Sequence, residues 1–432
     1  MPKGNGRRDY QALPEKYRVF LDAVAKKIPS NRIFCDPFRT MAHGTDASFY
    51  RLIPKIVVKV RAPEEVVLLL RTADRLSVPV TFRAAGTSLS GQAVTDSVLA
   101  VLAGGWRKHR ILDGGERIAL EPGIIGAEAN AFLAPFGRKI GPDPASINHC
   151  MIGGIAANNA SGMCCGTAQN SYRTVESMKI LLHDGTLLDT ADPLSCKDFV
   201  ESHPGLVAEI MRIRDEIRGD EPLQRRIEAK FRVKNTNGYS VNAFVDHDDP
   251  VDILLHLMIG SEGTLGFISE ITYRTVEEHA HKASALMIFP DIGSACRATT
   301  RLKTGPVSAV ELMDRASLRS VEDKEGMPAY LKSLGGEATA LLVETRAGDA
   351  AGLAGQMADV ARMLSGIPTV LPIAFTDRKA EYDKLWLVRK GLFPAVGAVR
   401  QVGTTVVIED VVFPIGRLAD ATLELERMMR NH

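Results

Sequence analysis

Glycine and hydroxyl residues gather in RAAGTSLSGQ, residues 83–92, directly after an apolar run. Gly86 and Gly91 allow backbone conformations that other residues rarely adopt. Successive backbone N–H groups in such a loop can form a concave nest for phosphate oxygens, and Arg83 adds positive charge. The segment is neither GxGxxG nor a P-loop, so the pattern indicates a phosphate site of another type. The alternative is an ordinary surface loop.

A second segment, GPDPASINHCMIGGIAANNASGMCCGT at 141–167, is long, low in charge and rich in small residues. Pro142 and Pro144 each restrict a backbone angle, whereas the glycines allow a flat ligand to approach the backbone closely. Asn158 and Asn159 supply hydrogen-bond donors and acceptors. This composition fits contact with a large planar ligand, or alternatively a buried Gly/Ala-rich packing segment.

A third segment, GSEGTLGFI at 260–268, repeats the combination of glycine and hydroxyl groups just before a predicted strand. Its lone carboxylate, Glu262, could accept hydrogen bonds from a ribose or from backbone N–H groups. The alternative is a simple turn before a hairpin.

The elements predicted around these segments are those of a mixed α/β domain. Apolar periodicity predicts helices over 14–29 and 205–230 and a further helix that begins at Pro63. Apolar runs bounded by turn signals predict strands over 56–60, 78–82 and 266–275. A hairpin is predicted over 175–190, with its turn at Asp184–Gly185. After about residue 277, the runs SALMIFP, VSAVELM, ATALLVET and TTVVIEDVVF predict strands that alternate with helices. We therefore expect a second α/β domain, whose last helix begins at Pro414.

Composition narrows the function classes. The 432 residues carry 53 basic and 52 acidic side chains, a net charge of +1 that gives no support for a nucleic-acid partner. The six cysteines form no CxxC pair, and we expect no metal site. No signal peptide and no transmembrane stretch is predicted. We expect a cytoplasmic protein, with peripheral attachment to the inner face of the membrane as the alternative.

In this order, the three segments resemble the FAD-binding domain of the vanillyl-alcohol oxidase (PCMH-type) superfamily, over roughly residues 45–275. Within it, the chain resembles the D-lactate, D-2-hydroxyglutarate and glycolate dehydrogenases, and INHCMIGGIAANNASGMCCGTAQNSYRTVESM resembles the iron–sulfur-containing D-lactate dehydrogenases. The resemblance implies an α+β fold: a PCMH-type FAD-binding domain of two α/β subdomains, then a partial α/β substrate (cap) domain. The implied ranges are an N-terminal helical segment at 1–45, the FAD-binding domain at 46–276 and a truncated C-terminal domain at 277–432.

The resemblance also implies which residues bind FAD. From the first segment these are Arg83, Ala84, Ala85, Gly86, Thr87, Ser88, Leu89, Gly91 and Gln92, around the pyrophosphate. From the second they are Pro142, Asp143, Ser146, Gly153, Gly154, Asn158, Ser161 and Gly162, along the pyrophosphate and the isoalloxazine. From the third they are Glu262, Gly263, Thr264 and Gly266, with Ile268 beside them.

Attachment of the flavin is expected to be non-covalent. Thr87 stands where histidine-linked relatives carry their histidine, so that bond is not available. Cys150 lies near the position at which some relatives attach a cysteine, but the resembling subgroup binds FAD without a covalent bond.

On the substrate side, LWLVRKGLF at 385–393 resembles the W-x-x-R motif of the family. Arg389 is there expected to bind the substrate carboxylate, since arginine binds carboxylates bidentately. The alternative is an exposed helical arginine. RVKNTNGY at 232–239 resembles another family stretch, which implies that Asn235 and Tyr239 face the flavin. ELMD at 311–314 also resembles the family, and Glu311 is expected to be structural.

The implied reaction is oxidation of a D-2-hydroxy acid by hydride transfer to flavin N5, with a quinone, cytochrome or iron–sulfur centre as acceptor. Ile408 stands where diacid-specific relatives carry lysine, which favours D-lactate. Relatives carry a histidine-rich metal motif beyond the equivalent of residue 432 and the long subgroup adds cysteine clusters, so a metal ion or iron–sulfur cluster is expected only with a further C-terminal part. The alternatives are a glycolate-oxidase-type or D-2-hydroxyglutarate dehydrogenase, or an FAD-binding fragment that is catalytically incomplete.

Overall fold

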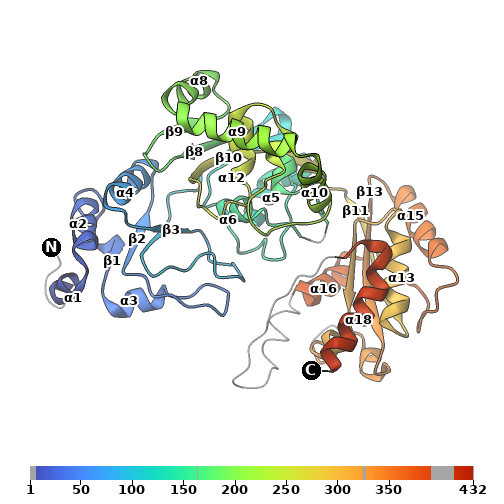
Figure 1. The fold of residues 1–432 in the computed structure, drawn as a ribbon. Coiled ribbons are helices and arrows are strands. Elements are labelled where there is room, and N and C mark those ends of the chain that lie inside the picture. Colours follow the sequence, from blue (N-terminus) through green and yellow to red (C-terminus); the bar gives the residue numbers. More distant parts are fainter. Residues whose placement is uncertain (1–5, 163, 325–326, 391–412, 432) are drawn as a thin grey trace. The chain divides into compact units, whose positions relative to one another are not determined.

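The chain forms two compact units, Met1–Glu277 and Glu278–His432, called here the first and the second unit (Figure 1). The structure is a computed structural model that describes residues 6–162, 164–324, 327–390 and 413–431. Helices and sheets are mixed in both units, which is the α+β architecture expected from the sequence.

The first sheet of the first unit has the strand order β1-β2-β4-β3. Its strands are β1 (Ile33–Phe34), β2 (Ile56–Val60), β3 (Val80–Arg83) and β4 (Val98–Leu102). Strands β2, β4 and β3 run parallel, and β1 is antiparallel to β2. Helix α4 (Pro63–Leu76) connects β2 to β3 and packs on helix α2 (Glu15–Val24) through apolar side chains. The residues that follow the carboxyl end of β3 are therefore held at one edge of the sheet, where α/β folds commonly bind ligands.

The second sheet has the order β5-β6-β10-β8-β9, is antiparallel throughout, and also pairs β7 with β10. Its strands are β5 (His109–Leu112), β6 (Arg117–Leu120), β7 (Arg138–Ile140), β8 (Val175–Leu181), β9 (Leu187–Asp189) and β10 (Phe267–Glu277). The predicted hairpin of β8 and β9 is confirmed, with Gly185 at a φ of 84° in the turn. The long central strand β10 joins β6, β7 and β8, so the third glycine-rich segment is anchored directly to the sheet.

Helices cover one face of this second sheet and enclose the largest core of the chain. The remaining helices of the first unit are α1 (Gly6–Ala12), α3 (Pro37–Ala42), α5 (Gly126–Leu133), α6 (Ile152–Asn158), α7 (Ser171–Thr174), α8 (Pro193–Ser202), α9 (Pro204–Gly219), α10 (Glu221–Phe231), α11 (Ala243–Asp246) and α12 (Pro250–Met258). Residues on β6, β8 and β10 alternate between this core and a charged face, where Arg110 and Lys179 both pair with Glu270. The helix predicted over 205–230 is the pair α9 and α10.

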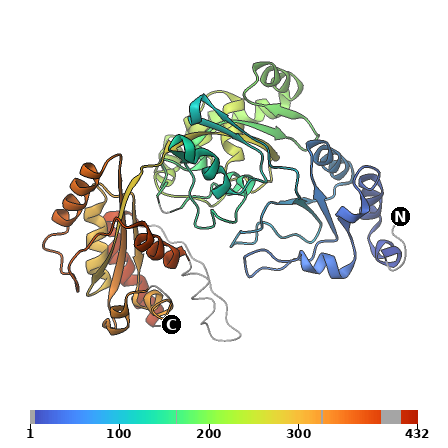
Figure 2. The ribbon, with the colours of Figure 1, turned by 180° about the vertical axis from the view of Figure 1, so that it is seen from behind.

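In the second unit, β13 (Thr339–Ala347) lies between β11 (His281–Phe289) and β12 (Ala309–Met313), antiparallel to both. Helices α13 (Ile292–Leu302) and α15 (Ala350–Met363) pack on one face, where Met287, Phe289 and Leu341 are buried. Helix α16 (Lys379–Lys390) lies on the other face, as Figure 2 shows. Helix α14 (Arg315–Arg319) follows β12.

Two sequence expectations concern the end of the chain. The strand predicted from TTVVIEDVVF falls, apart from its last residue, on positions outside the described ranges. The helix predicted to begin at Pro414 begins later, because Ile415–Arg417 form a 3₁₀ turn and α18 spans Leu418–Arg430. Among the helices of the described ranges, none is both long and apolar enough to cross a membrane.

The histidine pair His247 and His256 makes the stability of the first unit depend on pH. Their rings stack with centroids 3.8 Å apart, although the sequence alone gave His256 no partner. Burial lowers the pKa of His256 to about 4, and His247 acts in the same direction. The unfolded chain takes up this proton near pH 6.5 and the folded chain only near pH 4, so stability is lost as pH falls through that window, by about 3 kcal/mol at most. Urea unfolding at pH 7 and pH 4.5 measures the loss.

The substitution His256→Gln should reduce the difference in unfolding free energy between these two pH values. His183→Asn, at an exposed histidine, is the control and should leave the difference unchanged. An equal pH dependence in the wild type and in His256→Gln would contradict the prediction.

Candidate functional site

The first glycine-rich segment follows β3 as a loop, and the Arg83 side chain bonds to the backbone at the end of this loop. Arg83 is buried, and its Nε and Nη2 both donate to the carbonyl oxygen of Ala93, at 2.8 and 2.5 Å. Gly86 and Gly91 have φ values of 71° and 78°, which side chains disfavour, and a Cβ on Gly91 would lie 2.8 Å from the ring of Tyr50. The guanidinium of Arg83 thus fixes the loop, and its contact with a phosphate stays a prediction.

The second segment folds back on itself around Asp143. The Asp143 carboxylate accepts hydrogen bonds from the backbone N–H groups of Gly162, Cys164 and Cys165, at 3.1, 2.9 and 3.2 Å. A Cβ on Gly162 would lie only 1.7 Å from the carbonyl oxygen of Asp143. Asp143 therefore shapes the loop, a role that the sequence analysis did not assign to it.

Burial affects the thiols of two cysteines of this segment, Cys150 and Cys165. Burial raises the pKa of Cys165 to about 11, and the Asp143 carboxylate adds to the rise. Burial also raises the pKa of Cys150. Because the thiolate is the reactive form, neither group is activated as a nucleophile at neutral pH.

The three glycine-rich segments meet at the carboxylate of Glu262. Its Oε1 accepts a hydrogen bond from Nδ2 of Asn158 at 2.7 Å and lies 3.5 Å from Nε2 of Gln92. The backbone N–H of Glu262 donates to the carbonyl oxygen of Ala157 at 2.9 Å, with Glu262 at a φ of 53°. Burial raises the pKa of this carboxyl, whereas the bond from Asn158 lowers it. Residues from three distant parts of the sequence therefore form one polar cluster.

Two glycines keep side chains away from the end of β3. A Cβ on Gly154 would lie 3.6 Å from the Cβ of Ala84, and a Cβ on Gly263 would lie 3.8 Å from Phe82. Helix α6 and the third segment thus approach β3 with no side chain at these two positions. Such a surface of backbone and small residues fits a flat cofactor such as FAD.

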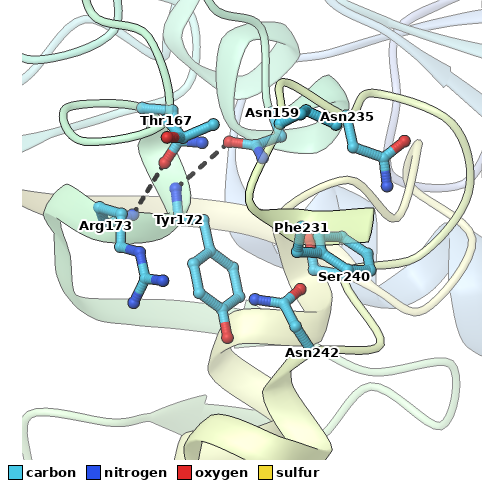
Figure 3. A pocket seen from close by; sticks show the side chains of 10 residues that line it. Asn159, Thr167, Tyr172, Arg173, Phe231, Asn235, Ser240 and Asn242 are labelled. Carbon is cyan, nitrogen blue, oxygen red and sulfur yellow. Dashed lines mark hydrogen bonds between the residues drawn. The ribbon is translucent and has the colours of Figure 1, made fainter. Parts of the chain in front are cut away.

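The stretch at 232–239 lies against the same segments. The hydroxyl of Tyr239 is 2.8 Å from Oγ1 of Thr264, in the third segment. Asn235 lines a polar pocket beside the second segment with Asn159, Tyr172 and Asn242 (Figure 3). Of the predicted residues, Tyr239 thus joins the third segment and Asn235 borders the second.

This pocket contains residues that the sequence analysis missed. The backbone N–H of Tyr172 donates to Oδ1 of Asn159 at 3.3 Å, as Figure 3 shows. Asn242 is only 5% exposed, and its Oδ1 has no hydrogen-bond partner among the described residues. A single asparagine at the start of a short helix carries no sequence signal of this kind, because its burial depends on packing.

In the second unit, the W-x-x-R motif lies on α16 and both of its named residues are anchored. Nε1 of Trp386 donates to Oγ of Ser284 at 3.0 Å. Nε and Nη2 of Arg389 donate to Oε2 of Glu311 at 2.9 and 2.5 Å. The Arg389 side chain is 31% exposed, so it is a partly buried, paired arginine rather than an exposed one. Ile408 lies outside the described residues.

No group of three or more His, Cys, Asp or Glu side chains that could hold a metal ion occurs within the described ranges. His256 stacks on His247, and the ring of His43 lies beside that of Phe34.

Comparison with known proteins gives two family matches. Residues 54–191 match the model described as "FAD binding domain", and residues 278–432 match "FAD linked oxidases, C-terminal domain". The alkyldihydroxyacetonephosphate synthase structure superposes with a TM-score of 0.61 at 15% identity, covering 89% of this chain and 69% of that one. At this identity, the superposition supports the fold alone.

Several curated relatives align along most of the chain. They are glycolate oxidase subunit GlcD of Escherichia coli (26% identical; 90% of this chain, 67% of the relative), the mitochondrial D-lactate dehydrogenase [cytochrome] of Arabidopsis thaliana (25%; 95% and 62%) and the D-2-hydroxyglutarate dehydrogenase of Pantoea ananatis (23%; 90% and 40%). The chain thus spans between two fifths and two thirds of the length of these relatives. With its FAD binding domain followed by the C-terminal domain of the family, the chain belongs to the FAD-linked oxidases of the PCMH-type superfamily.

Proposed function

We propose that the chain is an FAD-dependent dehydrogenase of a D-2-hydroxy acid, with D-lactate as the favoured substrate. The observation that carries this proposal is the meeting of the three glycine-rich segments at Glu262, within a unit that matches an FAD binding domain. The names of the relatives from Escherichia coli, Arabidopsis thaliana and Pantoea ananatis support a 2-hydroxy acid as the substrate class.

For the cofactor, the backbone of residues 83–92 binds the pyrophosphate, and the faces at Gly154 and Gly263 lie against the flat part of FAD. The remaining positions implied by the family resemblance complete this site. Glu262 accepts a hydrogen bond from a hydroxyl group of the cofactor, and Asn158 and Gln92 orient its carboxylate. The hydrogen bonds that converge on Glu262 support these roles.

For the substrate, Arg389 binds the carboxylate, and Asn235 and Tyr239 face the flavin. Bound FAD would supply, at its N5, the acceptor for the hydride from the substrate Cα, while the proton of the substrate hydroxyl would pass to a base. The electrons then pass to a quinone, a cytochrome or an iron–sulfur centre; the name of the Arabidopsis relative mentions a cytochrome. A cytoplasmic location, with or without peripheral contact with the membrane, belongs to the same proposal.

Two other substrates have a specific observation in their favour. Glycolate is favoured by the similarity to glycolate oxidase subunit GlcD, and D-2-hydroxyglutarate by the similarity to the Pantoea ananatis enzyme. Both are 2-hydroxy acids that need the same carboxylate-binding arginine, so one panel of substrates separates them from D-lactate.

The test is the visible absorption spectrum of the purified chain, before and after anaerobic addition of each acid. We expect oxidised flavin bands near roughly 370 and 450 nm, bleached by D-lactate and unchanged by L-lactate. Bleaching by glycolate or D-2-hydroxyglutarate alone would reassign the substrate. Flavin bands that none of these acids bleaches would leave an FAD-binding protein without this activity, and a folded chain that binds no FAD would refute the cofactor assignment.

A further inference from the structure

Helix α3 and the loop after it expose several large apolar side chains. Phe38 and Met41 lie three positions apart on α3, so they share a face of this helix, and Phe38 is 83% exposed. The loop adds side chains that are each about half exposed, namely Phe49, Tyr50, Leu52 and Ile53. A single exposed apolar side chain is ordinary, whereas a continuous group of them marks a surface that contacts another molecule.

Backbone contacts hold the helix and the loop together. The backbone N–H of Leu52 donates to the carbonyl oxygen of Gly44 at 3.1 Å. A Cβ on Gly44 would lie 3.2 Å from the carbonyl oxygen of Met41 and 3.7 Å from Cα of Ile53, so the end of α3 and the end of the loop are adjacent. Their exposed side chains belong to one region, called here the apolar surface, which comprises Phe38, Met41, Phe49, Tyr50, Leu52 and Ile53.

The apolar surface borders the first glycine-rich segment. The rings of Phe49 and Tyr50 have their centroids 4.3 Å apart, and Tyr50 packs against Gly91. The backbone N–H of Ala47 donates to the carbonyl oxygen of Gly86 at 3.0 Å. The loop after α3 thus runs beside the loop after β3, as Figure 1 shows. The apolar surface therefore adjoins the segment that is proposed to bind the FAD pyrophosphate.

Positive charge is concentrated in the part of the chain that carries the apolar surface. Residues 1–60 contain 12 Lys and Arg against 5 Asp and Glu, a net charge of +7, whereas residues 61–432 contain 41 against 47, a net charge of −6. The total of +1 conceals this division. Figures 1 and 2 show α1 beside α3, so the basic part of the chain adjoins the apolar surface. A charge asymmetry of this size indicates an anionic partner.

The acids close to the apolar surface are bonded within the protein. Asp36 accepts hydrogen bonds from the backbone N–H and from Nε of Arg39, at 3.0 and 2.5 Å. Oδ1 of Asp46 accepts one from the backbone N–H of Ser48 at 2.8 Å, and its Oδ2 is buried. Arg51, in the middle of the loop, is exposed. The surface therefore presents apolar side chains and a cation to its surroundings, rather than its carboxylates.

We propose that the apolar surface binds an anionic lipid bilayer. Its aromatic and aliphatic side chains insert among the lipid head groups, and the basic residues of the first 60 attract the lipid phosphates. A nucleic acid fits the charge but not the exposed apolar side chains. A second copy of the chain fits the apolar side chains but is repelled by the charge.

The use of this contact rests on the proposed function, whereas lipid binding itself does not. Because the apolar surface adjoins the first glycine-rich segment, a chain on the bilayer has its FAD site close to the lipid. Among the proposed acceptors, a quinone is the one that dissolves in the bilayer. The contact thus favours a quinone as the acceptor of the electrons.

Sedimentation of the FAD-loaded chain with lipid vesicles tests the charge. We expect binding to vesicles of phosphatidylglycerol mixed with phosphatidylcholine, and partitioning at least about tenfold weaker into phosphatidylcholine alone. Added salt should weaken the binding, because it screens the attraction. Arg51→Gln should lower the partition coefficient for the anionic vesicles about fivefold, since one cation near the lipid surface is lost.

The double variant Phe38→Ser/Met41→Ser tests the apolar contribution, because both side chains are exposed and their loss leaves the core unchanged. We expect its partition coefficient to fall more than tenfold. Leu194→Ser is the matched control: this leucine is 71% exposed, lies on α8 and is outside the basic part of the chain. The control should bind vesicles as the wild type does, and circular dichroism confirms that each variant is folded.

Equal partitioning into both kinds of vesicle, binding to neither, or wild-type partitioning of the double variant would overturn the proposal. A lipid-free wild type that is dimeric in sedimentation equilibrium, with a monomeric double variant, would also overturn it, since the surface would then join two copies. Bleaching of the flavin by D-lactate is recorded on the same samples. Vesicle binding without bleaching by any 2-hydroxy acid refutes the proposed function alone, and bleaching without vesicle binding refutes this inference alone.

Discussion

Replacing Gly162 with alanine is expected to abolish FAD binding, with a loss of affinity of more than 100-fold. A Cβ at this position would lie 1.7 Å from the carbonyl oxygen of Asp143 and 2.7 Å from its Oδ1, and the closest atom belongs to the backbone. The loop must therefore move, and the three hydrogen bonds that the Asp143 carboxylate accepts are lost or lengthened. Overpacking and lost hydrogen bonds together should cost about 3–5 kcal/mol.

The measurement is a titration of the apoprotein with FAD, in which quenching of the flavin fluorescence reports binding. Far-ultraviolet circular dichroism of the same apoprotein, either freshly purified or refolded, confirms that it is folded. Gly205→Ala is the matched control, because no atom lies within 4 Å of the added Cβ, and the position is inside α9. The control should bind FAD as the wild type does. Wild-type affinity in Gly162→Ala would mean that the loop around Asp143 is not essential for the cofactor.

Local patterns predicted many elements well, because neighbouring residues determine them. Pro63 followed by two acidic residues marks the start of α4, where a missing backbone N–H is harmless and negative charge is favourable. The Asp184–Gly185 pair marks the turn between β8 and β9, since Gly185 adopts a positive φ. The glycine-rich segments were also found from composition alone, and the structure brings them together.

Long-range contacts could not be predicted from the same patterns. Glu262 is 104 residues from Asn158 and 170 residues from Gln92, so their hydrogen bonds depend on the sheet order. The contact of Asp143 with the cofactor stays a prediction, and its carboxylate accepts hydrogen bonds from backbone N–H groups about 20 residues further on, which no sequence pattern indicated. Sequence composition shows which residues are polar, whereas only packing shows which partner each polar group takes.

The pairing of Arg389 with Glu311 is another long-range contact, so a test of the arginine has to take Glu311 into account. Arg389→Ala should lower kcat/KM for D-lactate by more than 100-fold, about 3 kcal/mol, because a charge-assisted contact with the substrate carboxylate is lost. Arg389→Lys should recover only part of this loss, since an ammonium group lacks the planar pair of donors. Steady-state kinetics with the FAD-loaded chain measures both, and Arg315→Ala, which breaks the pair with Glu322, is the control.

Loss of activity in Arg389→Ala alone has two explanations, because the variant also leaves Glu311 without the guanidinium it holds. The double variant Arg389→Ala/Glu311→Gln separates them, since it removes the stranded charge together with the arginine. We expect the double variant to regain thermal stability relative to Arg389→Ala and to stay more than 100-fold less active than the wild type. Recovery of activity in the double variant would show that Arg389 serves only as the counterion of Glu311, and the substrate carboxylate would then have to bind to a different cation.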